Sequence, residues 1–283
     1  MCELLTHARV AACLGARRRD SNKGDNGKGL LLAGSEGLFG AALMSAAACL
    51  RGGIGTLKAL CPTGARAYFA ALPEAMLLDV GATWTACDRA MVRAHVKEAD
   101  CIALGPGMGR EEAVQAILLA TLEAGKPTVI DADGLNALSA MAGERPPLHP
   151  NVILTPHPRE MHRLCGAPVM EIAADLPGYA ARYARAWGCT VLLKGAQSAI
   201  AAPDGRICRN ATGNAGLAKG GSGDVLTGII LALLGQGLSA FDAACAGSYL
   251  LGASAEEALA LLNERALLAR DVIDAIARTL QSF

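Results

Sequence analysis

Short, continuously apolar segments alternate along this chain with longer segments of helical periodicity. A strand that is buried on both faces shows no polar–apolar alternation, so this pattern favours a mostly parallel sheet with helices on both sides. Repeated strand–helix alternation therefore predicts a doubly wound α/β fold. The expected strands are residues 30–33, 56–61, 76–80, 101–104, 128–130, 152–154, 190–193, 199–202 and 206–208.

The helical segments fall into two groups. Those between the expected strands are residues 40–50, 111–124, 135–141, 160–165 and 179–187. After Asp224 the helical pattern continues without strand signals, over residues 225–234, 240–262 and 270–280, which predicts a helical layer that closes the fold. The hairpin 199–208, turned by Pro203-Asp204-Gly205, is expected to be antiparallel. The proline-rich loop 143–150 is a weak place for a division, and we favour a single domain over residues 1–283.

Composition narrows the class of protein. Lys plus Arg and Asp plus Glu both number 26, so the net charge of zero gives no reason to expect nucleic acid or an anionic membrane as a partner. The apolar runs are shorter than the ~18 residues that a membrane span needs, and we see no signal peptide. The 10 cysteines show neither C-x-x-C nor zinc spacing, so we expect small core residues in a reducing cytoplasm.

Polar and glycine-rich clusters directly follow five of the expected strands. In an open parallel sheet, ligands bind in the crevice beyond the carboxyl ends of the strands, so these clusters should converge on one cleft. Turn chemistry alone explains any one cluster but explains five of them poorly. The clusters are residues 34–35, 105–109, 131–134, 155–160 and 194–195.

A sixth cluster, residues 220–224 with the sequence GGSGD, opens the helix expected at 225–234. The N–H groups at a helix N-terminus are unpaired, and glycines let a phosphate approach them closely. Asp224 is then either a general base beside a phosphate, or simply a helix cap or a favourable partner of the helix dipole. The three glycines favour the role of Asp224 as a general base, because a simple cap does not need them. The motif is neither a Walker A sequence nor a dinucleotide fingerprint, and residues 105–109 also fail that fingerprint.

These motifs resemble one known family. Segment 214–237, NAGLAKGGSGDVLTGIILALLGQG, is similar to the C-terminal signature of the ADP-dependent NAD(P)H-hydrate dehydratases of the ribokinase-like superfamily. Blocks 17–62, 99–109, 129–138, 152–164 and 191–210 resemble the rest of that family in the same order, over roughly residues 18–252. The resemblance implies a three-layer α/β/α fold with a mostly parallel central sheet and a helical C-terminal region.

The resemblance also implies an activity, that of a metabolite-repair lyase. The substrates would be NADHX and NADPHX, in which water has added to the reduced nicotinamide ring, and the co-substrate would be ADP or ATP with Mg²⁺. Asp224 would deprotonate the hydroxyl for attack on the terminal phosphate, while the N–H groups of Gly221, Ser222 and Gly223 stabilise the transferred charge. Loss of phosphate would then restore the cofactor, with release of AMP.

Further roles follow from the resemblance residue by residue. The substrate contacts would be Ala41, Gly107, His157 and Asp224. Asp131, Asp133 and Asn136 would help to organise phosphate or metal, although the metal ligands stay unassigned. The residues that would hold the AMP portion of the nucleotide are Lys194, Gly195, Ala196, Gln197, Ser198 and Gly223.

Read one at a time, several of these residues have plainer explanations. Ala41 fits ordinary helix packing, His157 a proline-flanked turn, Glu160 a helix cap and Lys194 a solvated charge at a strand end. The sequence also departs from the family pattern in three places. Arg159 replaces a common glycine, Lys219 stands where many relatives have threonine, and Tyr249 lies where relatives often have histidine nearby.

Two other functions share the glycine-flanked aspartate: a kinase of a small alcohol, such as a vitamin precursor or sugar, and a catalytically silent nucleotide-binding regulator. The resemblance favours the dehydratase but does not decide whether ADP or ATP is the co-substrate. The family often forms homotetramers, and segment 241–262 would serve equally as an interface or as core. Since 283 residues leave no room for the epimerase domain of many bacterial relatives, we expect action on the S epimer alone.

Overall fold

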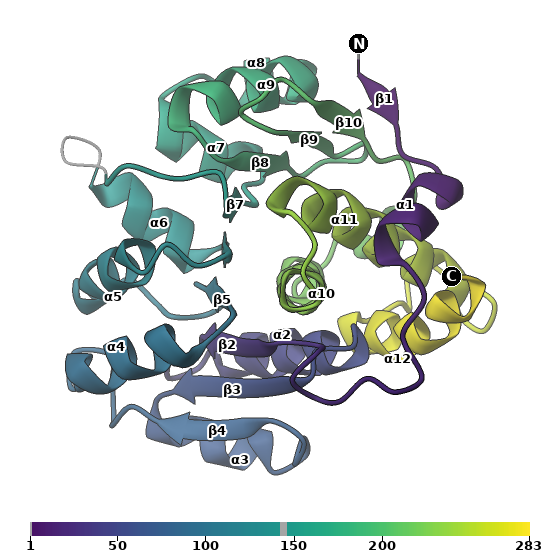
Figure 1. The fold of residues 1–283 in the computed structure, drawn as a ribbon. Coiled ribbons are helices and arrows are strands. Elements are labelled where there is room, and N and C mark those ends of the chain that lie inside the picture. Colours follow the sequence, from purple (N-terminus) through teal and green to yellow (C-terminus); the bar gives the residue numbers. More distant parts are fainter. Residues whose placement is uncertain (1, 142–145) are drawn as a thin grey trace.

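The computed structural model describes residues 2–141 and 146–283, and in these ten strands form one sheet (Figure 1). The sheet order is β1-β10-β9-β8-β7-β6-β5-β2-β3-β4. The strands are β1 (Glu3–Leu4), β2 (Lys28–Leu32), β3 (Thr56–Cys61), β4 (Met76–Asp79), β5 (Cys101–Leu104), β6 (Thr128–Ile130), β7 (Val152–Leu154), β8 (Thr190–Leu193), β9 (Ala199–Ala201) and β10 (Ile207–Arg209).

Neighbouring strands pair in parallel except where β9 pairs with β8 and with β10. The chain builds β2, β3 and β4 toward one edge and then returns to place β5 on the other side of β2. The strand order therefore reverses between β2 and β5. Such a reversal leaves a crevice at the carboxyl ends of the two strands, which is where ligands bind in open α/β sheets.

Helices cover both faces of the sheet. The helices are α1 (His7–Leu14), α2 (Phe39–Arg51), α3 (Arg66–Phe69), α4 (Arg89–Glu98), α5 (Ala113–Glu123), α6 (Asp133–Ala140), α7 (Pro158–Cys165), α8 (Val169–Ala174), α9 (Leu176–Trp187), α10 (Ser222–Gly235), α11 (Ala240–Ala258) and α12 (Ala269–Thr279), with short 3₁₀ turns at Thr63–Ala65, Ala215–Leu217 and Leu280–Ser282. Leu31 of β2 packs under α2, α10 and α11, whereas Leu30 and Leu32 pack in a second core under α4, α5 and α6. Both faces of the strand are thus buried, as its continuous apolar run predicts.

Helix α10 is the central helix of its layer. Its residues from Val225 to Leu234 are all buried, and Figure 1 shows it end-on between α2 and α11. Contact with α2 is close because Gly228 has no side chain: a Cβ there would lie 2.2 Å from the carbonyl oxygen of Ser45 and 2.8 Å from the Cβ of Ala48. This contact fixes the position of the α10 N-terminus, which carries the GGSGD motif.

The predicted α/β/α fold with a mostly parallel sheet is confirmed, as are all nine expected strands, the antiparallel hairpin and the closing helical layer. The sequence reading missed β1, α1, α3, α4 and α8. β1 has only two residues, both exposed, and α4 buries only Val92 and Val96, so neither shows a long apolar pattern. Within loop 143–150, residues 143–145 lie outside the described residues.

Three further expectations concern the cysteines, segment 241–262 and membrane-spanning helices. Seven of the ten cysteines are buried, and none forms a disulfide within the described residues. Thirteen residues of α11 are buried against the rest of the chain, so segment 241–262 contributes mainly to the core. Among the residues that the structure describes, no helix combines the length and apolar character needed to cross a bilayer.

Substitution of Gly228 by alanine should destabilise the protein by about 1–3 kcal/mol, because the new methyl group must push α10 and α2 apart. The matched control is Gly40→Ala in α2, where a Cβ meets no atom within 4 Å and a helix-favouring residue should raise stability slightly. Urea denaturation of both variants measures the difference. Equal stabilities would contradict the packing argument.

Candidate active site

The polar clusters that follow β6, β7 and β8 meet the N-terminus of α10 around one large cavity. Its volume is about 1030 Å³. Among the residues that line it are Asp131, Ala132, His157, Lys194, Gly195, Ala196, Ser198, Asn210, Thr212, Asn214, Lys219, Gly220, Gly221, Ser222, Gly223, Asp224 and Ser248. The predicted convergence on one cleft is therefore confirmed for the clusters after β6, β7 and β8, whereas clusters 34–35 and 105–109 do not line this cavity.

An ion pair forms one wall of the cavity. Lys194 Nζ, after β8, donates to Asp131 Oδ1 at 2.7 Å, and the exposed fractions of the two side chains are 21% and 2%. Thr227 of α10 donates to Asp131 Oδ2 at 2.9 Å. Glu160 of α7 lies 3.7 Å from the same Lys194 nitrogen. The pair thus ties the ends of β6 and β8 to α7 and α10, and Lys194 is not the solvated strand-end charge of the plainer reading.

Burial by itself would lower the pKa of Lys194, but the carboxylates of Asp131 and Glu160 outweigh it, so the pKa is raised and the ammonium stays charged. The pKa of Glu160 is also raised, because its burial outweighs the attraction of Lys194. These shifts describe a site in which one cation is shared by two carboxylates that have lost most of their contact with water.

His157 and Glu160 form a capping box at the start of α7. Nδ1 of His157 accepts from the backbone N–H groups of Arg159 and Glu160, and Glu160 Oε2 accepts from the His157 N–H at 2.8 Å. Burial, and then the nearby Lys194, lower the pKa of His157, so the ring is neutral at pH 7. Because Nδ1 is an acceptor, the ring proton lies on Nε2. His157 is half exposed and Nε2 lies 3.5 Å from Glu160 Oε1, so a ligand in the cavity would compete with Glu160 for this proton.

The N-terminus of α10 is open to the cavity. Gly221 precedes the helix with φ 98°, a left-handed conformation that favours glycine, and a Cβ there would lie 2.7 Å from Met44 Sδ. No side chain caps this helix, and in the described part of the chain the N–H groups of Ser222 and Gly223 have no hydrogen-bond partner. Unpaired N–H groups and the helix dipole suit an anion such as a phosphate.

Asp224 lies in the first turn of α10 and lines the cavity. Its side chain makes no capping bond, so the reading of Asp224 as a helix cap is wrong. Burial, and then repulsion by Asp131, raise the pKa of Asp224 to about 7, although Lys194 opposes the rise. A carboxyl group with a pKa near the working pH is well matched to general acid–base work.

Ala41 and Gly107 lie together at the reversal between β2 and β5, outside the lining of the large cavity. A Cβ on Gly107 would lie 3.1 Å from the Cβ of Ala41, and Ser35 Oγ donates to the Gly107 carbonyl at 2.8 Å. One turn along α2 from Ala41, Ser45 Oγ donates to the backbone carbonyl of Asp224 at 2.9 Å. Helix α2 thus links this pair of residues to the proposed base.

The other expected residues divide between two places. Gln197 belongs to the turn between β8 and β9 but does not line the large cavity, while Asp133 and Asn136 line a smaller neighbouring one. The sequence reading missed the far end of the large cavity, where Asn210 Nδ2 donates to Ser248 O and Oγ. The only signal for this end was the cluster of polar residues between 210 and 214.

Lys219 and Tyr249, two of the three departures from the family pattern, have side chains with structural roles, whereas Arg159 contributes a backbone N–H that glycine would also supply. Lys219 Nζ donates to the backbone carbonyls of Arg265 and Leu267 and so anchors the loop that leads into Gly221. Arg159 contributes its backbone N–H to the His157 cap. The Tyr249 carbonyl accepts from Thr212 Oγ1, and its ring packs edge-on against Phe283.

The carboxylates of this region do not form a metal site by themselves. No group of three or more His, Cys, Asp or Glu side chains within residues 2–141 and 146–283 is arranged to hold a metal ion. Asp131 is already engaged by Lys194 and Thr227.

Comparison with known proteins shows which family this chain resembles. A family model described as NAD(P)H-hydrate dehydratase matches residues 29–278. The chain is 36% identical over 283 residues to the ADP-dependent (S)-NAD(P)H-hydrate dehydratase of Bacillus subtilis, covering 98% of each protein. It is 40% identical over 291 residues to a bifunctional NAD(P)H-hydrate repair enzyme of Moorella thermoacetica, covering 99% of this chain but 54% of that protein. The chain thus spans about half the length of this bifunctional relative.

Solved structures agree with this similarity. The crystal structure of the B. subtilis ADP/ATP-dependent NAD(P)H-hydrate dehydratase, co-crystallised with ATP/Mg²⁺, matches with a TM-score of 0.87 and 34% identity over 99% of this chain and 98% of that chain. A ribokinase-like superfamily protein of Enterococcus faecalis matches with a TM-score of 0.86 and 25% identity over 99% and 96% of the two chains. The fold is therefore ribokinase-like.

Replacing Lys194 by methionine should lower the free energy of unfolding at pH 7 by about 3–5 kcal/mol, because the carboxylate of Asp131 then stays buried without its cation. The double variant Lys194→Met with Asp131→Asn should recover part of that loss. Lys97→Met, at an exposed position of α4, is the control for loss of a lysine charge. A single-variant loss no larger than that of the control would show that the pair is not structural.

Asp224→Asn should change how stability depends on pH. The pKa of Asp224 is about 7 in the folded protein against an ordinary value of 3.8, so the folded state holds the proton that the unfolded chain releases. Stability from this group is therefore present below about pH 4, falls as the pH rises to about 7, and stays constant above that.

The asparagine variant loses this fall, so it should gain stability relative to the wild type between pH 4 and pH 8. Urea denaturation across that range measures the gain. Asp274→Asn, at an exposed position on α12, should track the wild type. An Asp224→Asn curve parallel to the wild-type curve would rule out the raised pKa.

Proposed function

The chain belongs to the NAD(P)H-hydrate dehydratase family, and on that premise we propose that it is an ADP-dependent (S)-NAD(P)H-hydrate dehydratase. It repairs NADHX and NADPHX to NADH and NADPH and releases AMP and phosphate. The observation that carries the proposal is Asp224. Its carboxyl group has a pKa of about 7 and lies in the lining of a large cavity, in the first turn of a helix whose N-terminal N–H groups are unpaired.

The reaction follows from that arrangement in two steps. Asp224 accepts the proton of the hydrate's hydroxyl group, whose oxygen bonds to the terminal phosphorus of ADP as the bond to the AMP oxygen breaks. The N–H groups of Gly221, Ser222 and Gly223 stabilise the charge on the phosphoryl oxygens. In the second step the lone pair of the ring nitrogen expels phosphate, and loss of a ring proton restores the double bond.

The residues around Asp224 suit the two ligands. Lys194 and the turn after it, residues 195–198, would hold the AMP portion of the nucleotide with Gly223, whose Cα faces the Asp131–Lys194 pair. His157 would donate from Nε2 to the hydrate. Ala41 and Gly107 would contact the hydrate at the reversal between β2 and β5, where open α/β sheets bind ligands.

Mg²⁺ would enter the site bound to the nucleotide. When bound, it would neutralise charge on the phosphate oxygens. The co-crystallisation of the B. subtilis enzyme with ATP/Mg²⁺ supports this role. We further propose that residues 1–283 act as one domain, because β1 near the start of the chain pairs with the distant β10 in one continuous sheet. We also propose that the protein acts as a homotetramer in the cytoplasm.

The remaining alternative is a ribokinase-like kinase of a small alcohol. The two functions differ after the first step, because a kinase releases the phosphorylated alcohol whereas the dehydratase eliminates phosphate. The match of the family model to residues 29–278 favours the dehydratase. The preference for ADP over ATP rests on the name of the B. subtilis relative, and the other nucleotide is an arm of the test.

With NADHX, Mg²⁺ and ADP, the purified protein should restore the NADH absorbance band and release AMP and phosphate in equal amounts. A parallel reaction with ATP measures the nucleotide preference. Phosphorylation of hydroxyethylthiazole without any NADHX turnover would establish the kinase instead.

Asp224→Asn should lower kcat by at least about 10³-fold, while the dissociation constant for ADP stays near the wild-type value, because the base acts only in the reaction. Asp274→Asn is the matched control and should keep full activity. If Asp224→Asn turned over at the wild-type rate, another group would have to be the base.

A further inference from the structure

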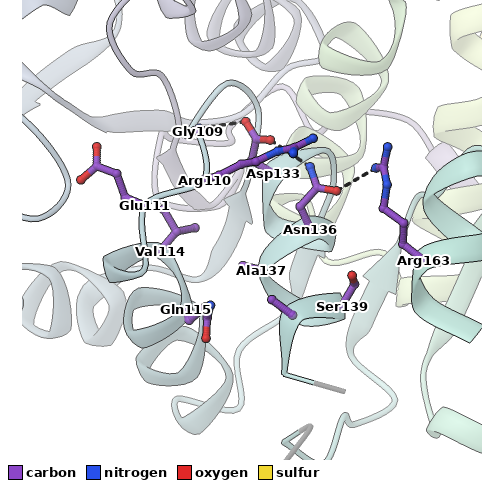
Figure 2. A pocket seen from close by; sticks show the side chains of 11 residues that line it. Gly109, Arg110, Glu111, Val114, Gln115, Asp133, Asn136, Ala137, Ser139 and Arg163 are labelled. Atoms are coloured by element: carbon purple, nitrogen blue, oxygen red, sulfur yellow. Dashed lines mark hydrogen bonds between the residues drawn. The ribbon is translucent and has the colours of Figure 1, made fainter. Parts of the chain in front are cut away.

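A second cavity of about 240 Å³ lies beside the active site, between the loop after β5 and helices α5, α6 and α7 (Figure 2). The volume is several times the share of about 30 Å³ that one water molecule occupies in the liquid. It therefore has room for a group the size of a phosphate. Asp133 and Asn136, which the family resemblance links to phosphate or metal, line this cavity, but its arginines have no role in the proposed reaction.

Two arginines line it. Arg163 of α7 donates through NH1 to Asn136 Oδ1 at 2.8 Å, and Asn136 Nδ2 donates to Asp133 Oδ1 at 3.0 Å. Asp133 Oδ2 in turn accepts from the Gly109 N–H at 2.8 Å (Figure 2). This chain of hydrogen bonds positions the Arg163 guanidinium and leaves most of its donors for a ligand. The second arginine, Arg110, is exposed and follows Gly109 directly.

The positive charges of this cavity have no carboxylate partner. Within residues 2–141 and 146–283, neither Arg110 nor Arg163 forms an ion pair. The two carboxylates that line the cavity are hydrogen-bonded by neutral groups: Asp133 by Gly109 and Asn136 of the same lining, and Glu111 by the N–H and hydroxyl of Thr85. Two guanidinium groups in one cavity are a natural site for phosphate, whose oxygens accept their paired N–H groups.

The second cavity, which we call the arginine cavity after Arg110 and Arg163, shares a wall with the large active-site cavity. Asp131 and Ala132 line the large cavity, and Asp133 lines the small one. Ala132 has φ 48°, the only positive φ of a non-glycine residue in the described chain, so this segment is held in a strained conformation between the two cavities. Gly109, which lines the small cavity, is two residues from Gly107, a separation of at most about 7 Å along the backbone. A ligand that touches Gly107 therefore lies close to the arginines.

We propose that Arg110 and Arg163 bind a phosphate group of the dinucleotide hydrate, remote from the ring that reacts. This inference rests on the proposed function and assigns two specificity-determining residues to the same substrate. Two phosphate sources fit this chemistry: the 2′-phosphate, present only in NADPHX, and the pyrophosphate, present in both hydrates.

The test compares kcat and KM for NADPHX and NADHX in Arg110→Met and Arg163→Met. For a bound phosphate, KM should rise roughly ten- to hundredfold in each variant with kcat nearly unchanged, because the contact is remote from the reacting atoms. A rise for NADPHX alone identifies the 2′-phosphate, and an equal rise for both identifies the pyrophosphate. Arg163→Lys keeps the charge without the paired donors and should recover only part of the affinity.

Arg93→Met, at an exposed position of neighbouring α4, is the matched control and should leave both KM values unchanged. Unchanged KM values in both cavity variants, or a fall in kcat without a rise in KM, would overturn the proposal. Calorimetric binding of NADP⁺ and NAD⁺ to the same variants gives a readout without turnover. If the wild type failed to turn over either hydrate, the proposed function would fail, while weaker NADP⁺ binding by the variants would still support the phosphate site.

Discussion

The ion pair between Asp131 and Lys194 is the interaction on which the active site depends. It joins the ends of β6 and β8, and through Thr227 and Glu160 it also holds α10 and α7. A buried ion pair adds little net stability compared with apolar packing, because both groups lose their hydration. Its value here is positional. The open N-terminus of α10 and the capped N-terminus of α7 are directed at the same cavity because each is tied to the same two charges.

The same pair sets the chemistry of Asp224. Burial and the negative charge of Asp131 raise the pKa of Asp224 to about 7, while Lys194 limits the rise. A carboxyl group with an ordinary pKa of 3.8 would be fully ionised at pH 7 but a much weaker base. Above pH 7 the folded protein therefore holds the ionised Asp224 carboxylate at a cost in stability. Such destabilising groups are common at catalytic sites.

The reversal of strand order between β2 and β5 would let the two proposed ligands meet. On the proposed function, the loops after β6 and β8 and the start of α10 would form the nucleotide side, whereas the loops after β2 and β5 would form the side with Ala41 and Gly107. Segment 131–133 lies between the large cavity and the arginine cavity. A dinucleotide that lies across this edge would place its ring near Asp224 and a phosphate near Arg110.

The sequence by itself determined the α/β class, the nine main strands and the positions of the polar clusters, because buried strands and their loops leave local patterns. The GGSGD motif likewise marked Asp224, since glycine and helix-terminus chemistry are local properties. Only the tertiary structure decided that Lys194 is paired with Asp131 rather than solvated, and that the Arg110–Arg163 cavity exists. It also assigned β1 to the sheet edge and α4 to the surface. These outcomes depend on contacts between residues far apart in the chain, and such contacts have no signature in local periodicity.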